Sequence, residues 1–198
     1  MNKKIEHIYE FAKQNDGIIT TKEIESLGIG KHVIKDCVSE GFLIREYKGI
    51  YSLAKEIPDE YAVLQKRSNK IIYSYGTALF FHGLSDRVPR TLDLTLPQGY
   101  NASRLKKAKL NLRIHYVQSK ILNIGVIDIK TPQGSSVKAY NKERCICDLI
   151  KHKNKVDKQL FIQAVKTYFS NPYNHRDIIK MSKLIGVENE IRKYMEVL

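Results

Sequence analysis

The chain has 198 residues, of which 42% are hydrophobic and 28% are charged. This composition supplies enough apolar side chains for a folded core and excludes a collagen-like or low-complexity chain. No apolar run approaches the roughly 18 residues of a membrane span, the N-terminus has no apolar segment typical of a signal peptide, and the three cysteines fit a reducing compartment. We therefore expect a cytoplasmic protein with one large domain or two small ones and no membrane partner.

The formal net charge of +13 is unevenly distributed along the chain. Residues 1–56 contain nine Lys/Arg and nine Asp/Glu, whereas residues 57–198 contain 25 and 12. A basic surface attracts polyanions, which include nucleic acid and acidic proteins. Charge alone does not choose between these two kinds of partner.

The first 56 residues combine helical and extended patterns. Apolar spacing predicts a helix over residues 2–14, which ends at a glycine-containing turn before a short strand at residues 18–20. Thr20 or Thr21 caps a second helix that runs to Leu27, and Thr20 with Glu23 matches a capping box. A third helix over residues 30–40 precedes strands at 42–45 and 49–53, joined by a turn at 46–49. This order is typical of a winged helix-turn-helix, and we place a domain boundary after residue 56.

The predicted third helix has an apolar face and a polar face, and the polar face carries Lys31, His32, Lys35 and Ser39. At 100° per residue, Val33, Ile34, Cys37 and Val38 fall on an apolar side that we expect to be buried. The third helix of a winged helix enters the major groove, and its hairpin contacts the DNA backbone or the minor groove. The amides that begin the second helix favour a phosphate. The candidate DNA-binding residues are Thr20, Thr21, Lys22, Lys31, His32, Lys35, Ser39, Arg45, Tyr47 and Lys48.

These residues leave two alternatives open. None of them is a clear base reader, and Lys31, His32 and Lys35 could each bind phosphate only. A winged helix used for protein contact is the other alternative, because the motif alone is a hypothesis.

Residues 57–198 predict an α/β domain with a helical C-terminal end, so the whole chain is expected to be α+β. Strands are predicted at residues 70–75, 91–96, 110–117, 124–129 and 137–140. Helices are predicted at residues 59–68, 76–82, 142–152, 155–170, 174–185 and 187–197. The strand at 91–96 alternates with period two, so we expect it to be half-buried.

One pattern in this domain raises the possibility of nucleotidyl transfer. It consists of Gly76-Thr77 at a helix start, followed by Asp93-Leu94-Thr95 on a strand. Nucleotidyltransferases place a small-residue turn at a helix start and an Asp-x-Asp strand that holds two metal ions. Here the second acidic position is Thr95, and one carboxylate cannot hold two ions. The expectation is a strand with one solvent-facing Asp, or a non-catalytic relative of that fold, without a catalytic residue.

The remaining polar clusters have structural interpretations beside the functional ones. Cys145, Cys147 and His152 lack the second pair that a structural zinc site requires, so we expect buried free thiols, no metal and no cofactor. His82 is expected to be a capping or core residue. Two basic runs could contact a polyanion or simply form solvated loops. They comprise Arg104, Lys106, Lys107 and Lys109 with Arg113, and the lysines of residues 151–158.

The sequence resembles the AbiEi family of antitoxins, the regulatory half of a bacterial abortive-infection, type IV toxin–antitoxin system. In the N-terminal part the resemblance rests on Gly28-Ile29-Gly30-Lys31-His32-Val33-Ile34, Gly41-Phe42-Leu43 and Lys48-Gly49-Ile50-Tyr51. In the C-terminal part it rests on Tyr75-Gly76-Thr77-Ala78-Leu79, His82-Gly83-Leu84-Ser85-Asp86, Pro89-Arg90, Glu143-Arg144 and Asp148-Leu149. His82, Asp86, Arg90 and Asp93 are the candidate motif residues of the antitoxin domain.

The resemblance implies a non-enzymatic protein of phage defence. Its winged helix would bind double-stranded inverted repeats in its own promoter and repress it, as a monomer in solution or a dimer on DNA. Its C-terminal domain would neutralise a nucleotidyltransferase-like toxin without a stable complex. The alternatives are a nucleotidyltransferase-like enzyme that uses Asp93 and a protein-interaction module that does not bind DNA.

Overall fold

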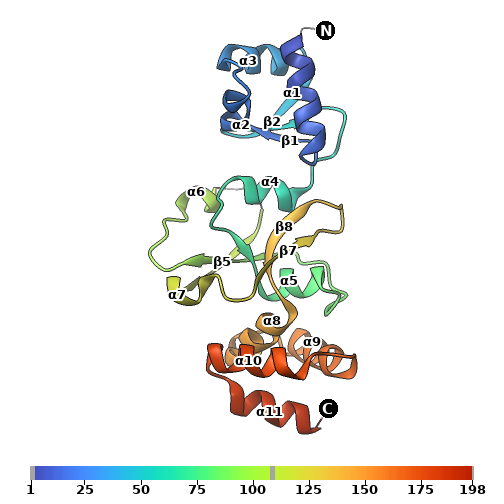
Figure 1. The fold of residues 1–198 in the computed structure, drawn as a ribbon, viewed down its shortest axis with the longest axis vertical. Coiled ribbons are helices and arrows are strands. Elements are labelled where there is room, and N and C mark those ends of the chain that lie inside the picture. The colour runs from blue at the N-terminus through green and yellow to red at the C-terminus, as the bar shows by residue number, and fades with distance from the viewer. Residues whose placement is uncertain (1–2, 108–109, 198) are drawn as a thin grey trace. The chain divides into compact units, whose positions relative to one another are not determined.

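The structure is a computed structural model that describes residues 3–107 and 110–197. It is mixed α/β with one three-stranded and one five-stranded sheet (Figure 1). The chain divides into two compact units. The first runs to Asn69 and includes Thr131–Val137, and the second comprises Lys70–Lys130 and Lys138–Leu198. In the described part of the chain, no helix has the length and hydropathy needed to cross a membrane.

The first unit contains the elements that the sequence predicts, in the same order. They are α1 (Lys3–Gln14), β1 (Ile18–Thr20), α2 (Thr21–Ser26), α3 (Lys31–Ser39), β2 (Leu43–Tyr47), β3 (Ile50–Leu53) and α4 (Glu60–Lys66). The capping box is present: the Glu23 amide donates to Thr20 Oγ1 at 3.2 Å, and the Thr20 amide donates to Glu23 Oε2 at 2.7 Å. Strand β2 extends to Tyr47, so the turn is shorter than the predicted 46–49.

Both faces of the three-stranded sheet are covered. Its strands are antiparallel in the order β1-β3-β2. One face joins α1, α2 and α3 in an apolar core formed by Ile5, Ile8, Ala12, Ile19, Ile24, Ile29, Val33, Ile34, Cys37, Leu43 and Leu53. Strand alternation directs Ile18, Ile50 and Ser52 to the other face, where they are also buried. Helix α4 contacts β1 and lies on the opposite side of the sheet from α1, α2 and α3 (Figure 1).

Two details differ from the sequence expectations. The first unit continues past residue 56 to Asn69, because α4 buries Ala62, Val63 and Leu64. Val38 was expected on the buried side of α3 but is 38% exposed. It lies on the last turn of the helix, at the edge of the apolar side.

The second unit is built on a five-stranded mixed sheet in the order β6-β5-β4-β8-β7. Strand β4 pairs antiparallel with β5 and parallel with β8, and β5 pairs parallel with β6. The strands are β4 (Ile72–Tyr73), β5 (Leu92–Pro97), β6 (Leu112–Val117), β7 (Val126–Lys130) and β8 (Ser136–Tyr140). Helix α5 (Tyr75–Phe81) packs on β5. The short helices α6 (Ser103–Lys106) and α7 (Ser119–Leu122) were not predicted.

The C-terminal part is helical, as predicted. It comprises α8 (Lys142–Lys151), the 3-10 turn η1 (Lys153–Lys155), α9 (Lys158–Ser170), α10 (His175–Ile185) and α11 (Glu188–Val197). Helix α8 is central, since it contacts α5, α9, α10 and α11. Cys145 and Cys147 are buried free thiols, as expected, and burial raises the pKa of both.

Strand β5 corrects the expectation of a half-buried strand. Every residue from Leu92 to Leu96 is buried, and Asp93 is only 4% exposed rather than solvent-facing. The strand lies between β4 and β6, with α5 and α7 in contact with it. Its polar residues can be buried because they are hydrogen-bonded: Thr95 Oγ1 donates to Ser74 Oγ at 2.9 Å, and the Asp93 amide donates to Thr77 Oγ1 at 2.8 Å.

Candidate functional site

The exposed face of α3 is the first candidate surface. Lys31, His32, Lys35 and Ser39 are all exposed, on the side of the helix opposite its buried residues. Lys31 Nζ lies 3.0 Å from Glu25 Oε1 of α2, in a pair whose side chains are 71% and 43% exposed. Such an exposed pair contributes little to stability, so Lys31 can exchange Glu25 for another anion at small cost.

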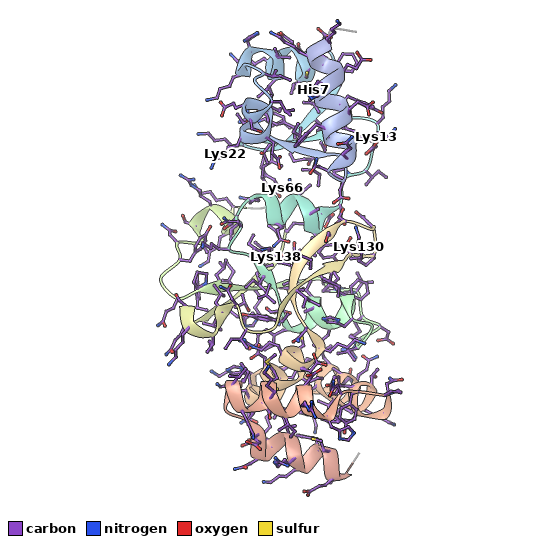
Figure 2. The ribbon with its side chains drawn as sticks, viewed as in Figure 1. His7, Lys13, Lys22, Lys66, Lys130 and Lys138 are labelled. Carbon is purple, nitrogen blue, oxygen red and sulfur yellow. The ribbon has the colours of Figure 1, made fainter. Side chains whose placement is uncertain are left out.

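A hydrogen bond joins the start of α2 to the tip of the β2–β3 hairpin. The Thr21 amide donates to the Gly49 carbonyl at 3.0 Å. Gly49 has a φ of +78°, and a Cβ there would lie 3.3 Å from Thr21 Oγ1, so glycine permits this close contact. The contact places the start of α2 against the turn that contains Lys48. Lys22 extends from α2 into solvent (Figure 2).

Thr20 and Tyr47 also have structural partners within the first unit. Thr20 Oγ1 accepts the capping hydrogen bond from Glu23. Tyr47 is half-buried under Arg67, whose guanidinium carbon lies 3.9 Å from the ring centroid. Arg45 is exposed, and the strand register shifts between it and Tyr47. Arg67 follows α4, outside the predicted N-terminal domain, so sequence reasoning missed its packing on the hairpin.

The basic charge is concentrated in the second unit. The residues of the first unit include 11 Lys/Arg and 11 Asp/Glu, whereas those of the second include 23 and 10. Arg104 and Lys106 of α6, with Lys107 after it, are exposed, and Lys109 lies outside the described residues. Lys153, Lys155 and Lys158 are exposed as well. Lys151 instead donates to the Ile185 carbonyl at 2.8 Å, which is a structural contact between helices.

The four candidate motif residues of the antitoxin domain do not form one cluster. His82 ends α5, and its Nε2 lies 2.8 Å from the Tyr140 carbonyl oxygen. Burial lowers the pKa of His82, which agrees with the predicted capping or core role. Asp86 accepts from Gln163 of α9 at 2.8 Å, and Arg90 is exposed. No described interaction joins these residues to Asp93.

Asp93 is instead the centre of a second cluster. Its Oδ1 lies 2.8 Å from His115 Nε2 and 3.5 Å from Arg113 Nη1, both on β6. The ring of Tyr75 stacks on His115, with 4.1 Å between the centroids. The Tyr75 hydroxyl lies 2.9 Å from His152 Nδ1 at the end of α8. Sequence reasoning found Asp93 but missed Tyr75, His115 and His152 as its neighbours, because they come from elements far apart in the chain.

The backbone at the start of α5 has an uncommon conformation in this cluster. Tyr75 has a φ of +41°, a region that residues other than glycine rarely adopt. A Cβ at Gly76 would lie 3.0 Å from Asp93 Oδ2, so glycine lets the helix start approach the carboxylate. Burial raises the pKa of the Tyr75 hydroxyl, which stays protonated at neutral pH. Within the described residues, no three His, Cys, Asp or Glu side chains converge in a way that could hold a metal ion.

Comparisons with known proteins identify the fold but no family. Neither the protein-family models nor the curated proteins include a match to this chain. Among solved structures, the chain is similar to the crystal structure of the RV2827C protein from Mycobacterium tuberculosis. The two share 11% sequence identity with a TM-score of 0.60, over 99% of this chain and 82% of that one. At this identity the similarity shows a shared fold alone.

Proposed function

We propose that the chain is a DNA-binding autorepressor and antitoxin of a bacterial abortive-infection operon, with the first unit acting as a winged helix-turn-helix. The observation that carries the proposal is the exposed polar face of α3 beside a hairpin whose tip is hydrogen-bonded to the start of α2. The toxin-neutralising role rests on the sequence resemblance to AbiEi antitoxins and belongs to the second unit.

The dimensions of α3 support its proposed role as the groove-binding helix. Nine residues at 1.5 Å rise give a helix about 14 Å long, comparable to the major groove, which is about 12 Å wide. Lys31, His32 and Lys35 would face the groove or its flanking phosphates, and Ser39 lies on the last turn. The Ser39 hydroxyl donates to the Asp36 carbonyl at 3.0 Å, which leaves its oxygen able to accept.

The hairpin would contact the DNA backbone. Arg45 and Lys48 are exposed on β2 and its turn, and the contact between Thr21 and Gly49 fixes the turn against α2. Because the first unit has equal numbers of acidic and basic residues, affinity would depend on this local arrangement rather than on its overall charge.

The proposal is tested by charge removal on α3. The double variant Lys31→Ala, Lys35→Ala should bind the promoter upstream of its own operon at least tenfold more weakly than the unaltered chain. Because each lost phosphate contact lowers the slope of log K against log salt by about 0.9, that slope should fall by up to about 2. Fluorescence anisotropy at several salt concentrations measures both quantities.

The matched control removes two exposed lysines elsewhere in the first unit, Lys13 and Lys55. The control variant Lys13→Ala, Lys55→Ala should bind within twofold of the unaltered chain. Equal affinity and equal salt slope for the α3 variant would contradict the assignment of α3 to the DNA groove.

A reporter of the same promoter tests repression in cells. The α3 variant should relieve repression while protection against the toxin gene of the same operon persists, because the two roles are assigned to different units. Joint loss of both activities in a folded α3 variant would contradict this division.

A further inference from the structure

The cluster around Asp93 in the second unit combines a buried carboxylate with a guanidinium and an imidazole. Asp93 and Thr95 of β5 pair in register with Arg113 and His115 of β6, so these four residues lie at neighbouring positions of two parallel strands. Asp93 Oδ1 contacts both Arg113 and His115. The resulting site has one negative charge and a guanidinium beside an imidazole.

This composition differs from that of a site that binds two metal ions. A two-metal centre for phosphoryl transfer requires several carboxylates around ions about 4 Å apart. Among the described residues, Asp93 is the one carboxylate that contacts Arg113 and His115, and the nearby Asp148 is paired with Arg144. Thr95 occupies the second position on the strand of Asp93 and donates to Ser74. The opposing positions on β6 hold Arg113 and His115, so the guanidinium of Arg113 supplies positive charge from the protein itself.

The Arg113 guanidinium and the His115 imidazole are both held in place and partly accessible. The Asp93 side chain is 5% exposed, while Arg113 is 64% exposed and His115 is 25% exposed. Because Arg113 contacts Asp93 through Nη1 at 3.5 Å, most of its five N–H donors face solvent. The His115 imidazole is held by Asp93 at its Nε2 and by the ring of Tyr75 on its face. The Tyr75 hydroxyl lies in turn beside His152.

The chain on either side of the cluster residues is rich in cations. The segment of residues 70–130 contains ten Lys/Arg and three Asp/Glu. His152 leads directly into the exposed Lys153, Lys155 and Lys158. An arginine with a planar fork of donors matches the geometry of phosphate oxygens, and further cations raise the local concentration of a polyphosphate.

We propose that Arg113 and His115, held by Asp93, bind the phosphate chain of a nucleotide without a metal ion. The shared chemistry is a phosphate chain, which a nucleoside triphosphate or an inorganic polyphosphate could supply. The inference goes beyond the proposed function and does not depend on it, because it concerns the second unit and its test contains no promoter DNA.

Isothermal titration calorimetry measures the binding of ATP and of inorganic tripolyphosphate to the full chain, with EDTA present to remove metal ions. Both ligands should bind and compete for one site. The variant Arg113→Gln should weaken ATP binding at least tenfold. The matched control Arg176→Gln removes an exposed arginine from α10 and should change the affinity less than twofold. Circular dichroism checks that both variants are folded.

The same experiment distinguishes a nucleotide from an inorganic polyphosphate as the source of the phosphate chain, and it can overturn the proposal. ATP binding that exceeds tripolyphosphate binding tenfold or more would identify a nucleotide as the ligand, and equal binding would identify the phosphate chain as the only determinant. Three results would overturn the proposal: no binding of either ligand at millimolar concentration, binding that requires Mg²⁺, or equal losses in the two variants. Binding of a 12-nucleotide single strand, but of neither small ligand, would also overturn it.

Discussion

Glu23 connects two helices of the first unit through one side chain. Its carboxylate accepts from the Thr20 amide at 2.7 Å and from Lys66 Nζ at 2.6 Å, so it links the start of α2 to α4. Partial burial raises the pKa of Glu23, but the hydrogen bonds with Lys66 and Thr20 outweigh this effect and the net pKa is lowered. The ionised carboxylate therefore stabilises the folded state above pH 4.5, and this contribution is lost as the pH falls through the lowered pKa.

The variant Glu23→Gln tests this role. Glutamine keeps the capping box but loses the ion pair, so we expect a loss of about 1 kcal/mol at pH 7. The difference from the unaltered chain should shrink as the pH is lowered from 5 to 3. Urea unfolding at each pH measures it, with the exposed Glu10→Gln as the control. A difference that stays constant over this pH range would contradict the ion-pair role.

Arg144 is a fully buried cation whose contacts hold a loop. It donates to Asp148 Oδ2 at 2.9 Å and, through Nη1, to the carbonyls of Ile121 and Ile124, each at 2.9 Å. Removing one partner of a buried pair leaves an uncompensated charge, so Arg144→Met should destabilise the chain by about 3–5 kcal/mol at pH 7.

The destabilisation of Arg144→Met should shrink in acid. Burial already raises the pKa of Asp148 and Arg144 opposes that effect, so without Arg144 the carboxyl becomes protonated more readily in the folded state. The double variant Arg144→Met, Asp148→Leu should recover most of the lost stability at pH 7, because no buried charge remains. Urea unfolding measures both effects, and a double variant as unstable as the single one would contradict the account.

At the scale of elements, α4 completes the first unit. It buries Val63 and Leu64 and covers a sheet face that includes Ile18 and Ile50. Burial of each large apolar side chain contributes about 1.5–3 kcal/mol, so a fragment of residues 1–56 should be less stable than residues 1–69 by about 3 kcal/mol or more. Urea unfolding followed by circular dichroism compares the two fragments, and equal stability would show that α4 is dispensable.

The elements of the first unit could be predicted because their signals are local. The capping box of Thr20 and Glu23, the glycine that ends α1 and the spacing on α3 all lie within a few residues of the element that they define. The second unit was less predictable where contacts between residues far apart in the sequence determine which side chains are buried. The alternation in β5 indicates a half-exposed strand, yet Asp93 and Thr95 are buried because Thr77, His115 and Ser74 bond to them.

The α3 face and the Asp93 cluster differed in how well they could be predicted, for the same reason. The exposed face of α3 could be predicted from the 100° spacing, since one helix supplies all its residues. The Asp93 cluster combines a helix start, two strands and the end of α8, so no sequence window contains it. The boundary at residue 56 followed the polar segment around Pro58, whereas the packing of α4 extends the first unit to Asn69.

At the scale of the whole molecule, the two units differ in charge. The first unit is neutral overall and carries the oriented polar face of α3, while the second holds the entire net charge of +13. This division supports a protein in which one unit would recognise a DNA site and the other would interact with a different polyanionic or protein target.

We propose that the first unit recognises a specific DNA site. The most direct measurement is a gel-shift titration of the full chain on the promoter upstream of its own gene, against a scrambled duplex of equal length at two salt concentrations. We predict binding to the promoter at least a hundredfold tighter than to the scrambled duplex, and a preference that persists at the higher salt concentration. Equal binding to both duplexes, lost together as salt rises, would contradict the claim and would assign the DNA affinity to charge alone.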